Sequence, residues 1–275
     1  MIYIFVPLYA EAVGLIKAGN MTPTEACAYL QCFANDEMFL TITGVGMSHM
    51  AAAVGAVCTK MNVKKGDIAV LYGSAAGIAN AKISSLYVGA RLYDVVSQRD
   101  GYPDLLTKTE LPKAVVASMD RIYEPTYTLP DPHGLALLYD MESSAFMQAC
   151  MLFLYTEQVC VLRFVSDDGS LQHPVVSLRE LGAKHADEAL RYMHHMAERI
   201  RYEEKEEWNL DELCKDLHAS AAMQRHLYQI MHYCRCMGMD AAEVLQWIYA
   251  EHVLPCRDRQ EGKKVLDAIE KKLCR

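Results

Sequence analysis

Short apolar segments rich in β-forming residues alternate with longer helical stretches over the first two hundred residues, and this alternation constrains the fold most. The predicted strands are Ile2–Leu8, Ala28–Phe33, Phe39–Thr43, Ile68–Tyr72, Leu86–Tyr93, Ala114–Ser118, Leu137–Met141 and Val159–Val165. The predicted helices are Met47–Met61, Glu142–Tyr155 and Leu178–Tyr202. Strands that are apolar throughout indicate a mixed sheet covered by helices on both faces. We therefore predict an α/β fold, a three-layer α/β/α sandwich with a mixed central sheet.

A charged run, Glu203–Glu207, separates this part of the chain from a second part with a different pattern. Such a run is typical of solvated surface. Beyond it only helical periodicity is found, with breaks at Gly238 and Pro255. The expected helices are one that contains Leu213 and Leu217, followed by Ala221–Cys236, Ala241–Val253 and Gln260–Leu273. We predict two domains, residues 1–206 with the α/β fold and residues 207–275 as an all-helical C-terminal extension.

Composition and charge argue against several classes of function. The formal net charge is −8, whereas nucleic-acid surfaces need clustered Lys and Arg, so we expect no nucleic-acid partner. No apolar run reaches the roughly 20 residues that span a bilayer, and the start Met1–Val6 lacks the basic flank of a signal peptide. We expect a cytoplasmic protein without a membrane partner. The ten cysteines include no C-x-x-C pair, so we expect reduced thiols, no metal and no cofactor.

Three segments carry residues suited to chemistry. The turn Leu71–Gly77 follows a predicted strand, and its small residues let a ligand approach the backbone while Ser74 offers a hydroxyl group. Many strand-to-loop turns share that composition, so this segment alone indicates little.

The second segment places Glu142 where the predicted strand Leu137–Met141 ends and an apolar helix begins. Open α/β sheets bind ligands at the carboxyl ends of their strands, and a helix N-terminus favours the ionised form of a carboxyl group. Because the helix 142–155 is apolar nearly all round, we expect it to be central. A buried, functional Glu142 is therefore favoured over a solvated charge in a first helical turn.

The third segment, Arg163–Gly169, ends the predicted strand Val159–Val165 with a hydroxyl and two acids. Successive side chains of an extended chain point to opposite sides. At least one of Asp167 and Asp168 can therefore be buried, and the alternative is a solvated turn.

Taken together, these segments resemble the nucleoside phosphorylase superfamily, most closely its methylthioadenosine/S-adenosylhomocysteine nucleosidases. The resemblance covers roughly residues 1–200 and keeps the order of the family's motifs. They are the early acid Glu11, the G-x-G turn Gly44–Gly46 running on to Ala51–Ala53, the turn Gly73–Gly77, the pair Met141–Glu142, and R-x-x-S-D at Arg163–Asp167. The last two at this separation are fairly specific, whereas the glycine turns are not.

The resemblance implies cleavage of the N-glycosidic bond of a purine nucleoside. It gives Asp167 the role of the acid that protonates purine N7, with Ser166 positioning it, and such help is worth about 10²–10⁴-fold in rate. An acid in this role must be shielded from water to keep its proton near neutral pH. Glu11 would orient or deprotonate the attacking water.

The resemblance also assigns the substrate-binding residues. Glu142 would bind the ribose hydroxyls, and its negative charge would favour a cationic transition state, while Met141 packs against the sugar. The turn that contains Ser74 and Gly77 would border the nucleoside. Ile122 and Tyr123 would lie near the base.

Water or phosphate as nucleophile is the main choice within the superfamily. Its phosphorylases usually carry an arginine two positions before the glycine of the middle turn, whereas the residue here is Leu71, which removes a charge-assisted phosphate contact. Hydrolysis to free base and sugar is therefore favoured. The alternatives are a phosphate-dependent phosphorylase and a catalytically weak nucleoside-binding sensor whose helical module binds a partner. The resemblance also implies a homodimer, in which Tyr93 and Tyr102 are candidates to reach a neighbouring site.

Overall fold

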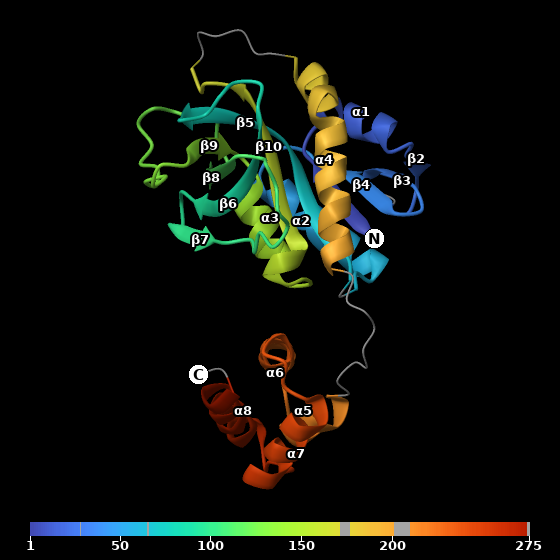
Figure 1. Cartoon of the computed structure of the whole chain (residues 1–275), viewed down its shortest axis with the longest axis vertical. Helices are drawn as coiled ribbons and strands as arrows, with labels where there is room; N and C mark the ends of the chain where they lie inside the picture. The colour runs from blue at the N-terminus through green and yellow to red at the C-terminus, as the bar shows by residue number, and fades with distance from the viewer. Residues whose placement is uncertain (28, 65, 171–176, 201–209, 274–275) are drawn as a thin grey trace. The chain divides into compact units, whose positions relative to one another are not determined.

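The computed structural model describes all residues except 28, 65, 171–176, 201–209 and 274–275 (Figure 1). The chain forms two compact units, Met1–Tyr202 and Glu203–Arg275. The expected domain boundary after residue 206 falls outside the described residues and stays a prediction. Among the residues that are described, no helix has both the length and the apolar character needed to cross a membrane.

In its described residues, the first unit combines ten strands with four α-helices and the short 3-10 helix Thr156–Gln158. Its elements are β1 (Ile2–Val6), α1 (Tyr9–Ala18), β2 (Thr22–Thr24), β3 (Gln31–Ala34), β4 (Met38–Ile42), α2 (Met47–Met61), β5 (Ile68–Ala79), β6 (Leu86–Asp94), β7 (Arg99–Gly101), β8 (Lys113–Ser118), β9 (Ala136–Asp140), α3 (Ser143–Cys150), β10 (Val159–Asp167) and α4 (Leu178–Ile200). The sheet order is β10-β6-β8-β9-β5-β1-β4-β3-β2, with β7 paired to β6. Parallel and antiparallel pairs both occur, so the predicted mixed α/β architecture is confirmed.

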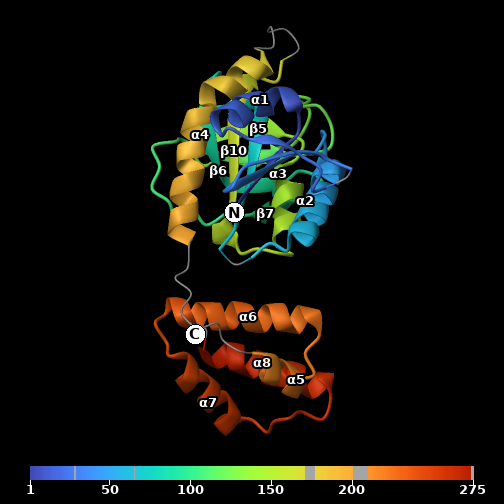
Figure 2. The same ribbon diagram turned by 90° about the vertical axis from the view of Figure 1, so that its right-hand side faces the viewer.

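Successive side chains of a strand point to opposite faces of the sheet, and one hydrophobic cluster lies on each face. Ile2 and Ile4 belong to a cluster that α1 and α4 cover, whereas Tyr3 and Phe5 belong to the cluster of α2 and α3. Figure 2 shows α4 on one side of the sheet and α2 and α3 on the other. Complete burial of such a side chain stabilises the fold by about 1.5–3 kcal/mol, which explains why the strands are apolar on both faces.

Part of the sheet closes into a ring at β10 instead of remaining an open layer. This strand pairs with β6 on one side and with β5 on the other, so β10, β6, β8, β9 and β5 close on themselves. The closure makes β5 longer than expected. Residues 73–77, predicted as a turn, continue the strand because Gly73 pairs with Arg163 of β10 and Gly77 pairs with Leu138 of β9.

Other boundaries also differ from the predictions. The helix α1 and the short strands β2 and β7 were not predicted, and β3 begins at Gln31, while Ala28 lies outside the described residues. The helix predicted to run from Glu142 to Tyr155 ends at Cys150, and Leu152 and Phe153 beyond it are exposed. The expectation that this whole segment is central is therefore wrong for its last turn.

The second unit consists of α5 (Asp211–Asp216), α6 (Ala221–Cys236), α7 (Ala241–Glu251) and α8 (Arg259–Leu273) (Figure 2). Its own core includes Leu227, Ile248 and Ile269, all fully buried. The predicted all-helical character is confirmed for the described residues 210–273. The helices α5 and α8 pack closely, since a Cβ on Gly262 would lie only 1.8 Å from the backbone oxygen of Leu217.

Candidate functional site

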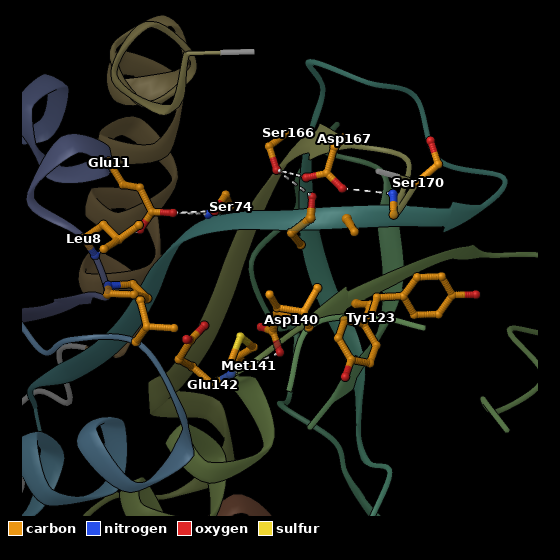
Figure 3. A pocket seen from close by; sticks show the side chains of 17 residues that line it. Leu8, Glu11, Ser74, Tyr123, Asp140, Met141, Glu142, Ser166, Asp167 and Ser170 are labelled. Atoms are coloured by element: carbon orange, nitrogen blue, oxygen red, sulfur yellow. Dashed lines mark hydrogen bonds between the residues drawn. The ribbon is translucent and has the colours of Figure 1, made fainter. Parts of the chain in front are cut away.

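A pocket of about 340 Å³ lies where β1, β9 and β10 end, beside residues 74–76 of β5. Figure 3 shows Glu11 with Ser74, the Ser166–Asp167 pair and the turn from Asp140 to Glu142 on three sides of it. The lining residues are Pro7, Leu8, Glu11, Val45, Ser74, Ala75, Ala76, Ile122, Tyr123, Tyr139, Asp140, Met141, Glu142, Ser166, Asp167, Gly169 and Ser170. All the site residues predicted from the sequence are among them except Gly77. A Cβ on Gly77 would instead meet Ala81 and Val165.

Glu11 is buried in the first turn of α1, with 1% of its surface exposed. Its Oε1 accepts hydrogen bonds from the Ser74 backbone nitrogen at 2.9 Å and from Ser74 Oγ at 2.5 Å. Its Oε2 accepts one from the backbone nitrogen of Leu8 at 3.2 Å, which satisfies a free N–H group at the start of the helix. The carboxylate is thus held in one orientation by α1 and β5 together.

Glu142 precedes α3 and is 4% exposed. Its Oε1 accepts a hydrogen bond from the Gly46 backbone nitrogen at 2.9 Å, and its Oε2 accepts one from Arg163 Nη2 at 3.0 Å. Burial raises the pKa of Glu142 to about 7 although Arg163 lowers it. The expectation that the helix N-terminus keeps this group ionised is therefore opposed by the cost of burying the charge.

Arg163 is a completely buried cation on β10 that the sequence did not assign a role. Its Nη2 contacts Asp140 Oδ2 at 2.6 Å, and its Nε donates to Ser143 Oγ at 3.3 Å. Its Nη1 has no hydrogen-bond partner among the described residues. A Cβ on Gly73 would lie 2.6 Å from this Nη1 and 3.0 Å from Glu11 Oε2, so the absence of a side chain there lets the cation and the acid approach each other.

Asp167 ends β10 and is half-buried. Its Oδ2 accepts a hydrogen bond from Ser166 Oγ at 2.7 Å, and its Oδ1 accepts one from the Gly169 backbone nitrogen at 2.9 Å. Gly169 has φ +74°, and a Cβ there would lie 2.7 Å from Tyr123. The turn after β10 therefore needs a glycine to bring Asp167 and Tyr123 to the same pocket. Asp168, by contrast, does not line the pocket.

Aromatic rings form the wall beside Asp167. Tyr123 and Tyr139 lie with ring centroids 5.2 Å apart, and Tyr139 donates a hydrogen bond to the Arg121 backbone oxygen at 2.8 Å. Tyr139 was not predicted as a site residue, because in the sequence nothing distinguishes it from the other apolar residues of its strand. Ile122 lines the pocket but is 74% exposed, so the chain itself leaves most of this side chain uncovered.

The pocket is strongly acidic. Four carboxyl groups line it, those of Glu11, Asp140, Glu142 and Asp167, and the lining contains no Lys, Arg or His. The Arg163 guanidinium lies behind this lining and is already paired with two of the acids. Within the described residues no group of three or more His, Cys, Asp or Glu side chains could hold a metal ion.

Over about 71–72% of its length, the chain has a fold similar to that of solved nucleosidases. The Arabidopsis thaliana 5′-methylthioadenosine nucleosidase has a TM-score of 0.58 at 14% identity, covering 71% of this chain and 95% of that one. A Helicobacter pylori futalosine hydrolase mutant has a TM-score of 0.53 at 15% identity, covering 72% and 98%. The Neisseria meningitidis 5′-methylthioadenosine/S-adenosylhomocysteine nucleosidase in complex with methylthio-immucillin-A has a TM-score of 0.54 at 14% identity, covering 72% and 98%.

The resemblance drawn from the sequence motifs is confirmed at the level of the fold by these structures. No protein-family model and no curated protein matches the sequence.

Proposed function

We propose that this chain hydrolyses the N-glycosidic bond of a purine nucleoside of the methylthioadenosine or S-adenosylhomocysteine type, releasing free base and sugar. One observation carries the proposal. Glu11 from α1, Glu142 from the end of β9 and Asp167 from the end of β10 meet in one pocket large enough for a small ligand (Figure 3). These three acids lie far apart in the sequence.

The proposed reaction uses the acids at different atoms of the substrate. As the bond between C1′ and N9 breaks, its electron pair passes to the base, and Asp167 donates a proton to N7 so that a neutral purine leaves. Water adds to C1′ and gives a proton to Glu11. Glu142 and Met141 bind the ribose, and negative charge nearby stabilises the positive charge that develops on the sugar.

Ser74 and Ser166 form hydrogen bonds with Glu11 and Asp167, the two acids proposed to transfer protons. Ser74 holds one oxygen of Glu11 through both its nitrogen and its hydroxyl group. The hydroxyl of Ser166, a residue that is 4% exposed, donates to Asp167. Tyr123 and Tyr139 offer aromatic surface for a base next to Asp167. Aromatic rings bind flat, apolar surfaces with little loss of side-chain entropy.

Phosphorolysis is the second candidate, and the charge of the pocket disfavours it. A phosphate ion would have to approach the carboxylate of Glu11 in a lining that contains no Lys, Arg or His. The Arg163 guanidinium behind this lining is already paired with Asp140 and Glu142. The position at which phosphorylases usually carry an arginine is the fully buried Leu71. Water, which is neutral, does not meet this repulsion.

A panel of purine nucleosides assayed with and without inorganic phosphate tests the proposal. We expect phosphate-independent release of base that falls about 10²–10⁴-fold in Asp167→Asn. The matched control is Asp168→Asn, because Asp168 is the adjacent acid but lies outside the pocket lining. A sugar 1-phosphate product would identify a phosphorylase. Binding without turnover, equal in wild type and Asp167→Asn, would identify a sensor.

The oligomeric state and location stay part of the proposal. Tyr102 is 55% exposed and Ile122 is 74% exposed, and burial of such side chains in a homodimer would remove apolar surface from water. Light scattering on the purified chain measures the mass, and a monomer would remove this part of the proposal. A cytoplasmic location follows only from the composition.

A further inference from the structure

Asp140 is a buried carboxylate with no part in the roles proposed above. Its Oδ1 accepts hydrogen bonds from Ser118 Oγ at 2.6 Å and from the backbone nitrogens of Glu142 at 3.3 Å and Ser143 at 3.2 Å. Its Oδ2 accepts one from Ser143 Oγ and lies 2.6 Å from Arg163 Nη2. Five groups thus fix one side chain, which is far more than a cap at the start of α3 requires.

Two carboxylates share the same nitrogen of one guanidinium group. Asp140 Oδ2 lies 2.6 Å and Glu142 Oε2 lies 3.0 Å from Arg163 Nη2. Arg163 is completely buried, and a buried cation without a counter-charge is strongly destabilising. If Glu142 were its only counter-ion, Glu142 could not turn to a ligand without leaving that cation unpaired. Asp140 removes this conflict because its own contacts hold it against Arg163.

We propose that Asp140 is a positioning residue, the permanent counter-ion of Arg163, which frees Glu142 to exchange its contact with Arg163 for a sugar hydroxyl. The inference rests on the proposed sugar-binding role of Glu142. Arg163 Nη1 lies next to Gly73 and has no hydrogen-bond partner among the described residues. The two other guanidinium nitrogens are held by Asp140 and Ser143.

Three charged side chains from different elements act on Glu142. They are Arg163 from β10, Asp140 from β9 and Glu11 from α1, and the remaining contact is the backbone nitrogen of Gly46. Burial is the largest cause of the raised pKa of Glu142, Arg163 opposes it, and Asp140 adds to it. Loss of the Asp140 charge would leave Glu142 as the only carboxylate paired with Arg163 Nη2, with Glu11 as the other acid that acts on the guanidinium, and would hold Glu142 in that ion pair.

The first test needs no enzymatic activity. A carboxyl group whose pKa rises on folding stabilises the fold below its unfolded pKa, and this stability is lost as the pH rises through the folded value. Wild type should therefore lose stability as the pH rises toward 7. In Asp140→Asn we expect this loss to move to lower pH by about one unit or more. A loss at the same pH as in wild type would overturn the proposal.

Two further variants complete this test. Ser118→Ala removes a hydrogen bond to Asp140 but keeps both charges, so it should lower the melting temperature without moving the pH of the loss. Glu142→Gln should keep the wild-type melting temperature below pH 6, because Asp140 still compensates Arg163. If Asp140→Asn does not fold, this variant decides, since a large loss of stability in Glu142→Gln would show that Asp140 is not a sufficient counter-ion.

The second test measures recognition of the sugar. Wild type should bind adenosine more tightly than 2′-deoxyadenosine, and in Asp140→Asn this preference should fall by about tenfold, the value of one hydrogen bond to a charged group. An unchanged preference would contradict the proposal. If wild type neither binds nor cleaves nucleosides, the proposed function fails, and the pH dependence of unfolding still decides whether Asp140 is the counter-ion.

Discussion

Replacing Gly73 by alanine inserts one methyl group between the buried cation and the acid of α1. An ideal Cβ at this position lies 2.6 Å from Arg163 Nη1, 3.0 Å from Glu11 Oε2 and 3.2 Å from Pro7 Cδ. The first distance is closer than a carbon and a nitrogen can pack without displacement. Arg163 cannot simply swing away, because Asp140 holds its Nη2 at 2.6 Å.

The size of the effect follows from that overlap. Overfilling a packed interior costs about 1–3 kcal/mol, and in a chain of this size each kcal/mol lowers the melting temperature by about 2–4 °C. A displacement of about 1 Å in a group that orients a reactant can cost about 10²-fold in rate. We therefore expect Gly73→Ala to melt several degrees lower and to lose roughly two orders of magnitude in kcat/KM.

Thermal unfolding followed by circular dichroism and nucleoside cleavage assays measure both effects. Gly55→Ala is the matched control, because Gly55 lies in α2 and a Cβ there meets no atom within 4 Å. Alanine in a helix is favoured over glycine by about 1 kcal/mol, so this variant should be as stable as wild type or more so, with unchanged activity. Wild-type stability and turnover in Gly73→Ala would refute the close approach of Arg163 and Glu11.

Three other expectations follow from the structure. Ser74→Ala removes the 2.5 Å hydrogen bond to Glu11. It should lower the free energy of unfolding by about 1.5–3 kcal/mol and reduce kcat more than it changes KM. Unchanged denaturant unfolding and unchanged kinetics would contradict this. The pKa of Glu142, raised from 4.5 to about 7, should make wild type lose up to about 3 kcal/mol of unfolding free energy between pH 5 and 8, whereas Glu142→Gln should not show this loss in urea titrations. Gly262→Ala places a Cβ 1.8 Å from the backbone oxygen of Leu217, so calorimetry should show the helical unit unfolding at lower temperature while cleavage persists; an unchanged transition would disprove that close packing.

The strands and helices were predictable wherever burial alone decides them. Both Met47–Met61 and Ala221–Cys236 have the bounds that periodicity predicts. The extension of β5 through Gly73 and Gly77 was not predictable, because small residues look like a turn until β9 and β10 supply their backbone hydrogen bonds. The end of α3 was missed because apolar residues such as Phe153 are partly exposed after it.

The site was predictable in its acids and not in their coupling. Motif order pointed to Glu11, Glu142 and Asp167, and all three line the pocket. Local sequence says nothing about the sharing of Arg163 by Asp140 and Glu142, since the contact joins β10 to the end of β9. One signal was present: an arginine inside the apolar strand Val159–Asp167 must be either exposed or paired. That argument indicates a buried acid near Arg163 without identifying it.

The charges of the pocket connect the fold to the choice of nucleophile. In surroundings of intermediate dielectric, two like charges about 4 Å apart repel by about 4 kcal/mol. An anion that enters the pocket is therefore disfavoured by each lining carboxylate that no cation offsets, and in the proposed reaction the ionised Glu11 is the first of these. The nearby cation, Arg163, is already paired with Asp140 and Glu142. In the proposed reaction, the same acids favour a sugar ring that becomes positive as its bond to the base breaks. An arrangement that disfavours phosphate and favours a positively charged sugar supports water, a neutral nucleophile, in the proposed reaction.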